Sequence, residues 1–284
     1  MRDTSWGSAV AVPLGVLTLG LILAACGSSG GPTPSQKAAT AGILKTTTTD
    51  TPPTTAPRAT TTDPPPRCAR YSSALYGIDP DDLAQTGGGS QLVTVVAPTG
   101  RSLTGNFVAW AEGADGCWSP VVFAGQPEQP YQAQLGYGGL LPLSHRVPGD
   151  WATPTGLFSF GNTVYGNSTV SPTTRYPYHH LVCGDWWNEE PGSTTYETFQ
   201  HVPCDTTPPY AADSEALWTE VQPYQHFIDI PMPNPPDNGA GIFLHDDMAV
   251  GYTEGCVALP NAELDAVLGW LDPAANPHIL ITVG

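Results

Sequence analysis

Residues 241–260 read GIFLHDDMAVGYTEGCVALP, and this stretch says most about the fold and the chemistry of the chain. The apolar run from Ile242 to Leu244 leads to His245, and eleven residues after His245 the chain reaches Gly255 and Cys256. An imidazole can take the proton of a thiol, and the resulting thiolate attacks carbonyl carbons. The stretch therefore predicts a cysteine nucleophile with a histidine base, whereas His245 alone would equally fit a packed histidine.

The same residues resemble the signature of the L,D-transpeptidase (YkuD-like) catalytic domain family, in which a His precedes a Ser/Thr-His-Gly-Cys motif. Thr253, Gly255 and Cys256 match that motif, and His245 matches the upstream His. Glu254 stands where most members have a second His. The match therefore indicates a member with a Thr-Glu-Gly-Cys variant of the motif.

A second segment resembles the same family, about a hundred residues upstream and in the same order. Residues 153–160 read TPTGLFSF, similar to the Thr-Pro-Thr-Gly-x-Phe segment of the family. Thr-Pro-Thr-Gly favours a turn, and the alternating apolar residues after Gly156 predict a strand. The resemblance implies a mainly β domain, an L,D-transpeptidase-like β-sandwich or barrel with one helix after the catalytic Cys loop.

The order of elements expected from the sequence agrees with such a domain. A short helical lead-in is expected near the start of the domain, and one helix is predicted after Pro260, where Leu264, Val267, Leu268 and Leu271 recur at helical spacing. Asp272 and Pro273 end that helix. Apolar and β-branched runs predict strands at 91–96, 107–111, 118–123, 157–160, 224–230, 242–245 and 279–283.

The N-terminal residues resemble a bacterial lipoprotein signal. Residues 10–25 are apolar and uncharged, a run of about 16 residues, which is short for a span of roughly 20. The run ends in Leu-Ala-Ala before Cys26, so we expect residues 1–26 to be a signal peptide ending at a lipidated Cys26. An ordinary signal peptide or an uncleaved anchor is the alternative.

The next segment predicts a tether. Residues 27–67 are rich in Thr, Pro, Gly and Ser and have almost no large apolar residue, so they cannot bury a core and are expected to be disordered. The catalytic domain is then expected at 68–284, with 68–90 as a lead-in. The mature protein would be exported and lipid-anchored to the outer face of the bacterial cytoplasmic membrane.

Charge excludes one class of partner. The chain has a formal net charge of −17, and only four of its nine basic residues, Arg70, Arg101, Arg146 and Arg175, follow Cys68. A nucleic-acid surface needs clustered cations, so we expect no nucleic-acid partner.

We also expect no metal and no cofactor. His179 and His180 are adjacent on a predicted strand and point to opposite faces, so they cannot easily share one metal, and we expect one packed and one exposed ring. Trp186 and Trp187 are expected to pack in the core or a loop, with a wall for a sugar or peptide as the alternative.

Six cysteines are present. Cys26 belongs to the signal, and the resemblance nominates Cys256 as the free nucleophile. Exported thiols tend to pair, and the remaining four allow three connectivities. Pairing of nearest neighbours predicts Cys68–Cys117 and Cys183–Cys204. A structural role for Cys256, with another cysteine free, is the rival interpretation.

The resemblance implies a specific reaction. Cys256 would attack the carbonyl of the third residue of a peptidoglycan stem tetrapeptide and expel the terminal D-Ala, leaving a thioester. An amine of another stem would then form a 3→3 cross-link, and water would instead give a carboxypeptidase. His245 is the expected base, steered by the Asp246 carbonyl, and the Gly255 and Cys256 amides are the expected oxyanion hole. The resemblance also implies acylation of Cys256 by carbapenems.

Further side chains are candidate substrate contacts: Arg146, Trp151, Tyr252, Thr253 and Glu254. Glu254 would raise the pKa of the thiol if it faced it, and it could otherwise fix His245 or bind the cation of an amine acceptor. Two other classes of protein stay open. One is a non-catalytic cell-wall-binding lipoprotein, and the other is a papain-like endopeptidase, although those usually place Cys before His.

Overall fold

A computed structural model describes residues 68–210, 214–233 and 241–284. All of these residues belong to one compact unit, which spans Thr62–Gly284. The predicted signal peptide, the lipidated Cys26 and the tether lie outside the described residues. Within the described residues, no helix combines the length and the apolar character needed to cross a bilayer.

The main sheet has twelve strands in the order β5-β6-β15-β1-β2-β4-β14-β13-β12-β7-β8, with β3 paired to β2. The bounds of its strands are β1 Gln91–Ala97, β2 Thr104–Glu112, β3 Trp118–Pro120, β4 Tyr131–Gln134, β5 Leu140–Pro142, β6 Thr153–Ser159, β7 Val164–Gly166, β8 Tyr178–His180, β12 Phe227–Asp229, β13 Phe243–Asp246, β14 Val257–Leu259 and β15 His278–Val283.

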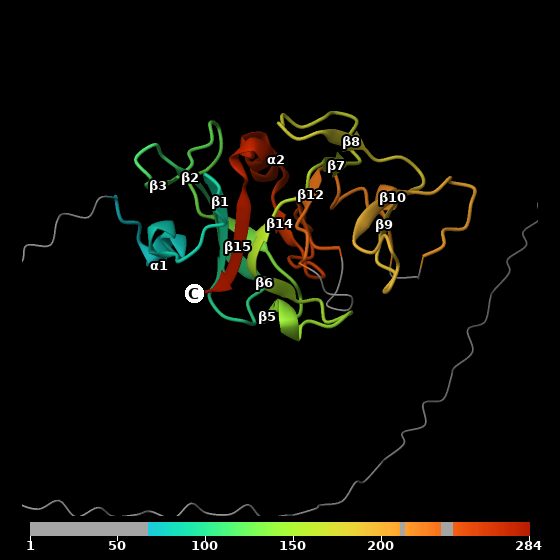
Figure 1. Ribbon diagram of the computed structural model, residues 1–284, viewed down its shortest axis with the longest axis horizontal. Coiled ribbons are helices and arrows are strands. Elements are labelled where there is room, and N and C mark those ends of the chain that lie inside the picture. The colour runs from blue at the N-terminus through green and yellow to red at the C-terminus, as the bar shows by residue number, and fades with distance from the viewer. Residues whose placement is uncertain (1–67, 211–213, 234–240) are drawn as a thin grey trace, which may run out of the picture. The chain divides into compact units, whose positions relative to one another are not determined.

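Strand β1 lies in the interior of this sheet, and all seven of its residues are buried. It pairs with β2 in antiparallel and with β15 in parallel orientation, so both of its edges are hydrogen-bonded and its β-branched side chains are covered on both faces. Figure 1 shows β1 and β15 side by side, with α2 at one end of these strands. The apolar and β-branched run predicted as a strand at 91–96 is therefore an interior strand of the sheet.

Helix α2 (Asn261–Trp270) follows the Cys loop and buries Leu264, Val267 and Leu268. The predicted helix and the predicted mainly β fold are therefore both confirmed. The other helical elements are short: α1 (Ser73–Tyr76), η1 (Pro80–Asp82), η2 (Leu143–His145), η3 (Leu217–Thr219) and η4 (Pro273–Ala275). Of these, α1 and η1 fall in the expected helical lead-in.

The turn predicted at Thr153–Gly156 is wrong, because this segment is already the first part of strand β6. Thr153 to Thr155 pair with β5 in parallel orientation, and only from Gly156 onward does β6 pair with β15. Pro154 therefore lies in a part of the strand that has a partner on one side only, where its missing N–H costs no ladder hydrogen bond. Pairing with distant residues overrides the local turn preference.

A second, three-stranded sheet has the order β10-β9-β11, with β9 at Asp185–Asn188, β10 at Thr198–His201 and β11 at Glu215–Ala216. Figure 1 shows β9 and β10 grouped apart from the central strands. Trp187 of β9 is 3% exposed, and its ring meets Phe243 of β13 at 5.1 Å. Trp186 packs on Trp218, so both tryptophans are packing residues.

Two bridges brace the domain, Cys68–Cys117 and Cys183–Cys204, and Cys256 is free and buried. Both predicted pairs and the free thiol are confirmed. The second bridge closes the loop that contains β9 and β10.

The two adjacent histidines have separate partners. His179 bonds the buried Asp185 at 2.8 Å and is 40% exposed, and His180 bonds the carbonyl of Ser168. The ring of His179 packs edge-on against Tyr165 at 5.9 Å and Phe199 at 4.9 Å, whereas His180 is exposed, which agrees with the expectation of one packed and one exposed ring.

Candidate active site

His245 and Cys256 are brought together by the parallel pairing of β13 and β14. Leu244 lies opposite Val257 and His245 opposite Ala258. Because side chains alternate along a strand, Cys256, two residues before Ala258, projects from the same face as His245. The Cys side chain and the imidazole therefore share one face of two neighbouring strands.

The sulfur of Cys256 is buried, with the residue 8% exposed. Its thiol donates to the carbonyl of Gly241 at 3.2 Å, and the sulfur accepts the amide of Phe243 at 3.3 Å. Burial raises the pKa of the thiol far above its ordinary value, and the nearby Glu215 carboxylate raises that pKa further. The resting cysteine is therefore a neutral thiol.

His245 is also buried, at 3% exposure. Its Nδ1 lies 2.6 Å from the Asp246 carbonyl, which assigns the proton to Nδ1 and leaves the lone pair on Nε2. Burial lowers the pKa of His245 to about 4. The carbonyls of Asp246 and Pro223 favour the charged ring and raise this pKa, but their effect is smaller than that of burial. The imidazole is therefore neutral near pH 7 and can accept a proton at Nε2.

The Asp246 carboxylate has partners other than His245. It accepts the amide of His226 at 2.9 Å and the side-chain amide of Asn261 at 2.8 Å. Asp246 thus orients His245 through its backbone carbonyl, and its side chain ties β13 to the start of β12 and α2.

The loop before Cys256 is fixed by Thr253, which is 1% exposed. Its hydroxyl donates to the Cys256 carbonyl at 2.8 Å and accepts the Gly255 amide at 3.2 Å. The Gly255 amide is thereby occupied. Among the described residues the Cys256 amide has no acceptor, so of the two expected oxyanion-hole donors this one is available.

Gly255 is required by this loop geometry. Its φ is +133°, a conformation that residues with a side chain rarely adopt. A Cβ at this position would lie 3.1 Å from the Ala152 carbonyl and 3.3 Å from Arg146 Nη2. The glycine therefore lets the nucleophile loop approach β6 and the Arg146 guanidinium.

A cavity of about 660 Å³ contains the Cys256 and His245 side chains. Four of the five predicted substrate contacts line it: Arg146, Trp151, Thr253 and Glu254. The fifth, Tyr252, packs against Tyr137 at 4.9 Å between ring centroids, and Tyr137 meets Trp151 at 6.0 Å. The structure thus places four of the five at the cavity, and Tyr252 is linked to it only through Tyr137 and Trp151.

Arg146 brings the positive charge of this cavity. The residue is 4% exposed, and its Nη2 lies 3.4 Å from Asp150 Oδ1. Nε and Nη1 have no hydrogen-bond partner among the described residues. A buried guanidinium with unused donors is suited to an anionic group such as a carboxylate.

Trp151 is held in an unusual backbone conformation beside the cavity. Its φ is +54°, and the side chain is 42% exposed. The Trp151 carbonyl accepts the Gly138 amide at 2.8 Å, and a Cβ on Gly136 would lie 2.3 Å from the same oxygen. The segment around Gly136 and Gly138 therefore packs closely against the backbone of Trp151, whose indole is partly exposed to solvent.

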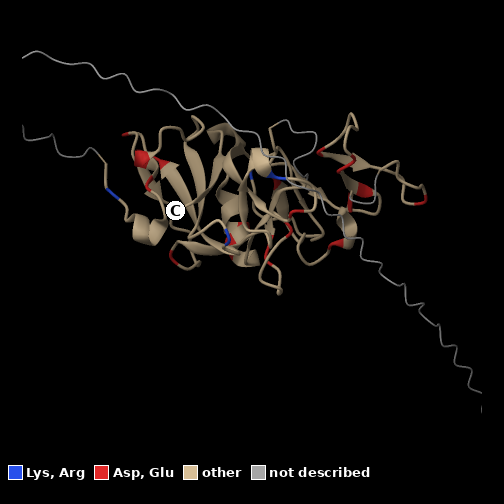
Figure 2. Cartoon of the chain, turned by 90° about the horizontal axis from the view of Figure 1, so that it is seen from below, with Lys and Arg blue, Asp and Glu red and all other residues tan. Residues whose placement is uncertain are grey.

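Sequence reasoning missed the acidic wall of the cavity. Besides Glu254, three carboxylates line it: Glu189, Glu215 and Glu220. Glu215 accepts the hydroxyl of Tyr224 at 2.5 Å. Glutamates in loops carry no periodic signal, so nothing in the sequence distinguishes these from the many other acidic residues. Figure 2 shows acidic positions scattered over the described chain and very few basic ones.

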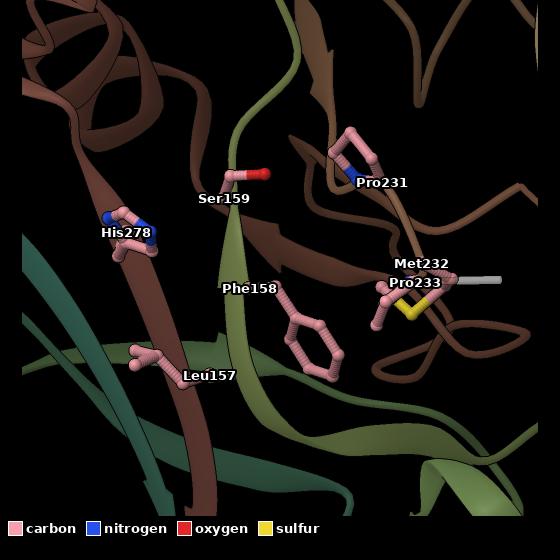
Figure 3. A pocket seen from close by; sticks show the side chains of 7 residues that line it. All are labelled: Leu157, Phe158, Ser159, Pro231, Met232, Pro233 and His278. Atoms are coloured by element: carbon pink, nitrogen blue, oxygen red, sulfur yellow. The ribbon is translucent and has the colours of Figure 1, made fainter. Parts of the chain in front are cut away.

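A second hollow, of about 350 Å³, lies between β6, β15 and the segment after β12 (Figure 3). Figure 3 shows the ring of Phe158 and the side chain of Met232 facing it. None of the predicted site residues lines this hollow. The chemistry-bearing side chains are therefore concentrated in the cavity of Cys256.

Comparison with known families agrees with this geometry. The sequence model of the L,D-transpeptidase (YkuD) catalytic domain matches residues 120–280, more than half of the chain. The chain belongs to the L,D-transpeptidase catalytic domain family. The matched residues include β6, both strands that present His245 and Cys256, and Arg146. Neither the curated proteins nor the solved structures gave a match to this chain.

Membership sets the general activity. An L,D-transpeptidase domain is a cell-wall enzyme, and the family acts on peptidoglycan stem peptides and is acylated by β-lactams. Within the described residues, no group of three or more His, Cys, Asp or Glu side chains is placed to hold a metal ion.

Proposed function

We propose that this L,D-transpeptidase domain forms 3–3 cross-links between peptidoglycan stem peptides through a thioester on Cys256. One observation carries the proposal: an imidazole that is bonded through Nδ1 to the Asp246 carbonyl and a free thiol project from the same face of β13 and β14 into one cavity. This is the arrangement that nucleophilic catalysis by cysteine needs.

In the first half-reaction, the thiol leaves the Gly241 carbonyl and passes its proton to His245 Nε2 as the sulfur attacks the carbonyl carbon of the third stem residue. The oxyanion is stabilised by the Cys256 amide. When the C–N bond breaks, His245 returns the proton to the nitrogen of the departing D-Ala. The thioester forms without net loss or gain of a proton by the enzyme.

The raised pKa of the thiol fits this order of events. A buried thiolate would be costly before substrate arrives, so the neutral thiol is the stable resting form. The positive charge of Arg146 lowers the pKa of the thiol. Arg146 would also bind the carboxylate of the donor stem, and the ring of Trp151 would pack on the peptide beside it.

Location is a further part of the proposal. A lipidated Cys26 would hold the protein at the outer face of the cytoplasmic membrane, and residues 27–67 would give the domain reach into the wall. Both rest on the sequence of the N-terminal residues. In cells given a lipid label, we expect the wild-type protein to be labelled and its processing to be blocked by globomycin, and we expect Cys26→Ala to carry no label. A wild-type protein that is neither processed nor labelled would contradict the anchor.

The first experiment is intact mass spectrometry of the protein, with both disulfides formed, after incubation with meropenem. A stable adduct is expected on the wild type and not on Cys256→Ala. A tetrapeptide assay with an added stem amine then separates transfer from hydrolysis, which would make the protein an L,D-carboxypeptidase. No adduct, with Cys256 shown to be free, would favour a non-catalytic cell-wall-binding protein.

A further inference from the structure

Glu215 is the buried ionisable group that the mechanism above leaves unused. It begins β11, the edge strand of the second sheet, and lies opposite Trp187 of β9. It lines the cavity of Cys256 and accepts the hydroxyl of Tyr224 at 2.5 Å. A carboxylate from a separate sheet thus reaches the site of the nucleophile.

Gly241 connects this carboxylate to the thiol. A Cβ on Gly241 would lie 3.4 Å from Glu215 Oε1, and the carbonyl of the same residue accepts the Cys256 thiol at 3.2 Å. Glu215 and Cys256 therefore both border the backbone of Gly241. The negative charge of Glu215 is also the strongest single charge effect on the thiol.

Tyr224 links Glu215 to the catalytic histidine. Its ring meets His245 edge-on at 5.6 Å and Phe243 at 5.6 Å. The Tyr224 hydroxyl donates to Oε2 of Glu215 and so restricts rotation of the carboxylate. The other oxygen, Oε1, takes no part in this bond. Tyr224 thus positions Glu215 in the same shell of side chains that holds His245.

The second half-reaction needs such a group. A primary amine acceptor is an ammonium ion near pH 7, because the ordinary pKa of a lysine-type amine is about 10.4, and it must lose a proton before it attacks the thioester. His245 is a weak base for this step, since burial lowers its pKa to about 4. It also has no negative charge to attract a cation.

We infer that Glu215, held by Tyr224, binds the ammonium group of the acyl acceptor and takes its proton during cleavage of the Cys256 thioester. This rests on the proposed function. In the step, the thioester, R–NH3⁺ and the Glu215 carboxylate give the amide, the Cys256 thiol and the Glu215 carboxylic acid. The amine gives up two protons, one to Glu215 and one to the departing sulfur through His245.

The surroundings of Glu215 suit a base that works near neutral pH. The pKa of Glu215 is raised to about 7, mainly by burial and also by the negative charges of Glu220 and Glu254. The hydrogen bond from the Tyr224 hydroxyl acts in the opposite direction and lowers this pKa. Glu189 also faces Gly241. These carboxylates make this side of the cavity negative, opposite in sign to the Arg146 guanidinium that faces Gly255.

The test separates the two half-reactions in Glu215→Gln. Acylation by meropenem should be kept or become faster, because loss of the negative charge lowers the pKa of the thiol. Transfer of a tetrapeptide acyl group at pH 7 to the side-chain amine of Nα-acetyl-lysine amide, which is an ammonium ion at this pH, should fall by about 100-fold, within the range for general base catalysis. In the wild type the transfer rate should rise up to about pH 7 and then level off, whereas in the variant it should keep rising above pH 7 with the fraction of free amine.

Two further variants complete the test. Glu190→Gln removes one carboxylate from the same sheet region outside the cavity and should transfer at the wild-type rate. Tyr224→Phe leaves the carboxylate in place without its hydroxyl partner, so the ratio of its transfer rate to its own acylation rate should fall and the pH midpoint of transfer should shift. It also keeps the inference testable if Glu215→Gln fails to fold.

The outcomes are distinct. Equal transfer rates in wild type and Glu215→Gln, with normal acylation of both, would overturn the role of Glu215 and leave the proposed function intact. If Glu190→Gln loses as much transfer rate as Glu215→Gln, the loss comes from the overall change in charge and not from the position of Glu215. That result would also overturn the inference. Absence of any adduct on the wild type would overturn the proposed function together with this step.

Discussion

The hydroxyl of Thr253 donates to the carbonyl of Cys256 at 2.8 Å and so fixes the peptide that carries the nucleophile. We predict that Thr253→Val, which keeps the shape but removes the hydroxyl, leaves the Gly255 amide without its acceptor and the Cys256 carbonyl with only the longer bond from Thr153. A buried polar group without a partner costs about 1–3 kcal/mol. The meropenem acylation rate should fall about 10-fold or more, whereas Thr253→Ser should retain most of it.

Gly255→Ala should abolish acylation. The residue has a φ of +133°, and its Cβ would lie 3.1 Å from the Ala152 carbonyl. Such strain costs on the order of 1–3 kcal/mol and would displace the loop from β6. Thermal unfolding and adduct formation should both report the change. Gly251→Ala is the control, because a Cβ there meets no atom within 4 Å although its φ is also positive; a normal Gly255→Ala enzyme would refute the assigned role.

Acylation should not slow down as the pH falls from about 8 to 5. The pKa of His245 is lowered to about 4, so the base is neutral throughout this range, and the raised pKa of the thiol keeps Cys256 protonated. Stopped-flow acylation by a carbapenem across this range measures the profile. A rate that drops tenfold per unit below pH 6.5 would show that His245 titrates as an exposed imidazole.

The fold should be less stable at pH 8 than at pH 5. Burial raises the pKa of Glu197 to about 7, of Glu215 to about 7 and of Asp229 to about 6. In the unfolded chain these groups lose their protons near pH 4.5, so between about pH 4.5 and 7 the folded protein binds more protons and stability falls as pH rises. The lowered pKa of His245 acts in the opposite direction between about 4 and 6.5, and the three carboxyl groups outweigh it.

Glu197→Gln isolates one contribution. The amide keeps the shape, still accepts the backbone amides of Gly241 and Met232, and cannot ionise. Thermal melts at pH 5 and 8 should show a smaller difference in the variant, mainly through a higher melting temperature at pH 8. Glu112→Gln, on an exposed residue at the end of β2, should leave the difference unchanged. An unchanged pH dependence in Glu197→Gln would mean that its carboxyl group is not protonated in the fold.

Removing the bridge between Cys183 and Cys204 should destabilise the second sheet and thereby the cavity. The sequence separation is 21 residues, for which the entropy of loop closure gives about 3 kcal/mol. The Cys183→Ser, Cys204→Ser variant should melt at a lower temperature and lose more amine transfer than acylation, because Glu215 lies in this sheet while Cys256 directly precedes β14 of the main one. An equal loss of the acylation rate and the transfer rate would argue against separate roles of the two sheets in the two steps.

Local patterns of the sequence were enough for several features. The apolar run that ends at His245, the Gly-Cys pair eleven residues later and the Leu and Val spacing after Pro260 are each short-range, and the structure has the strand, the free thiol and α2 where they predict them. The two disulfides followed from nearest pairing, since a loop that closes over few residues costs the least chain entropy.

Other features depend on residues far apart in the chain. Pairing with β5 made a strand of the predicted turn at Thr153–Gly156, and β4 and β14, which the sequence did not predict, meet through Ala258 and Gln134. Glu215 and Tyr224 reach the catalytic cavity from segments that show no chemical motif. The sequence by itself singled out the pair of His245 and Cys256, because the two residues lie only eleven positions apart in one stretch. Only the tertiary structure decided what surrounds them, because burial, charge and positive φ angles arise when distant segments pack together.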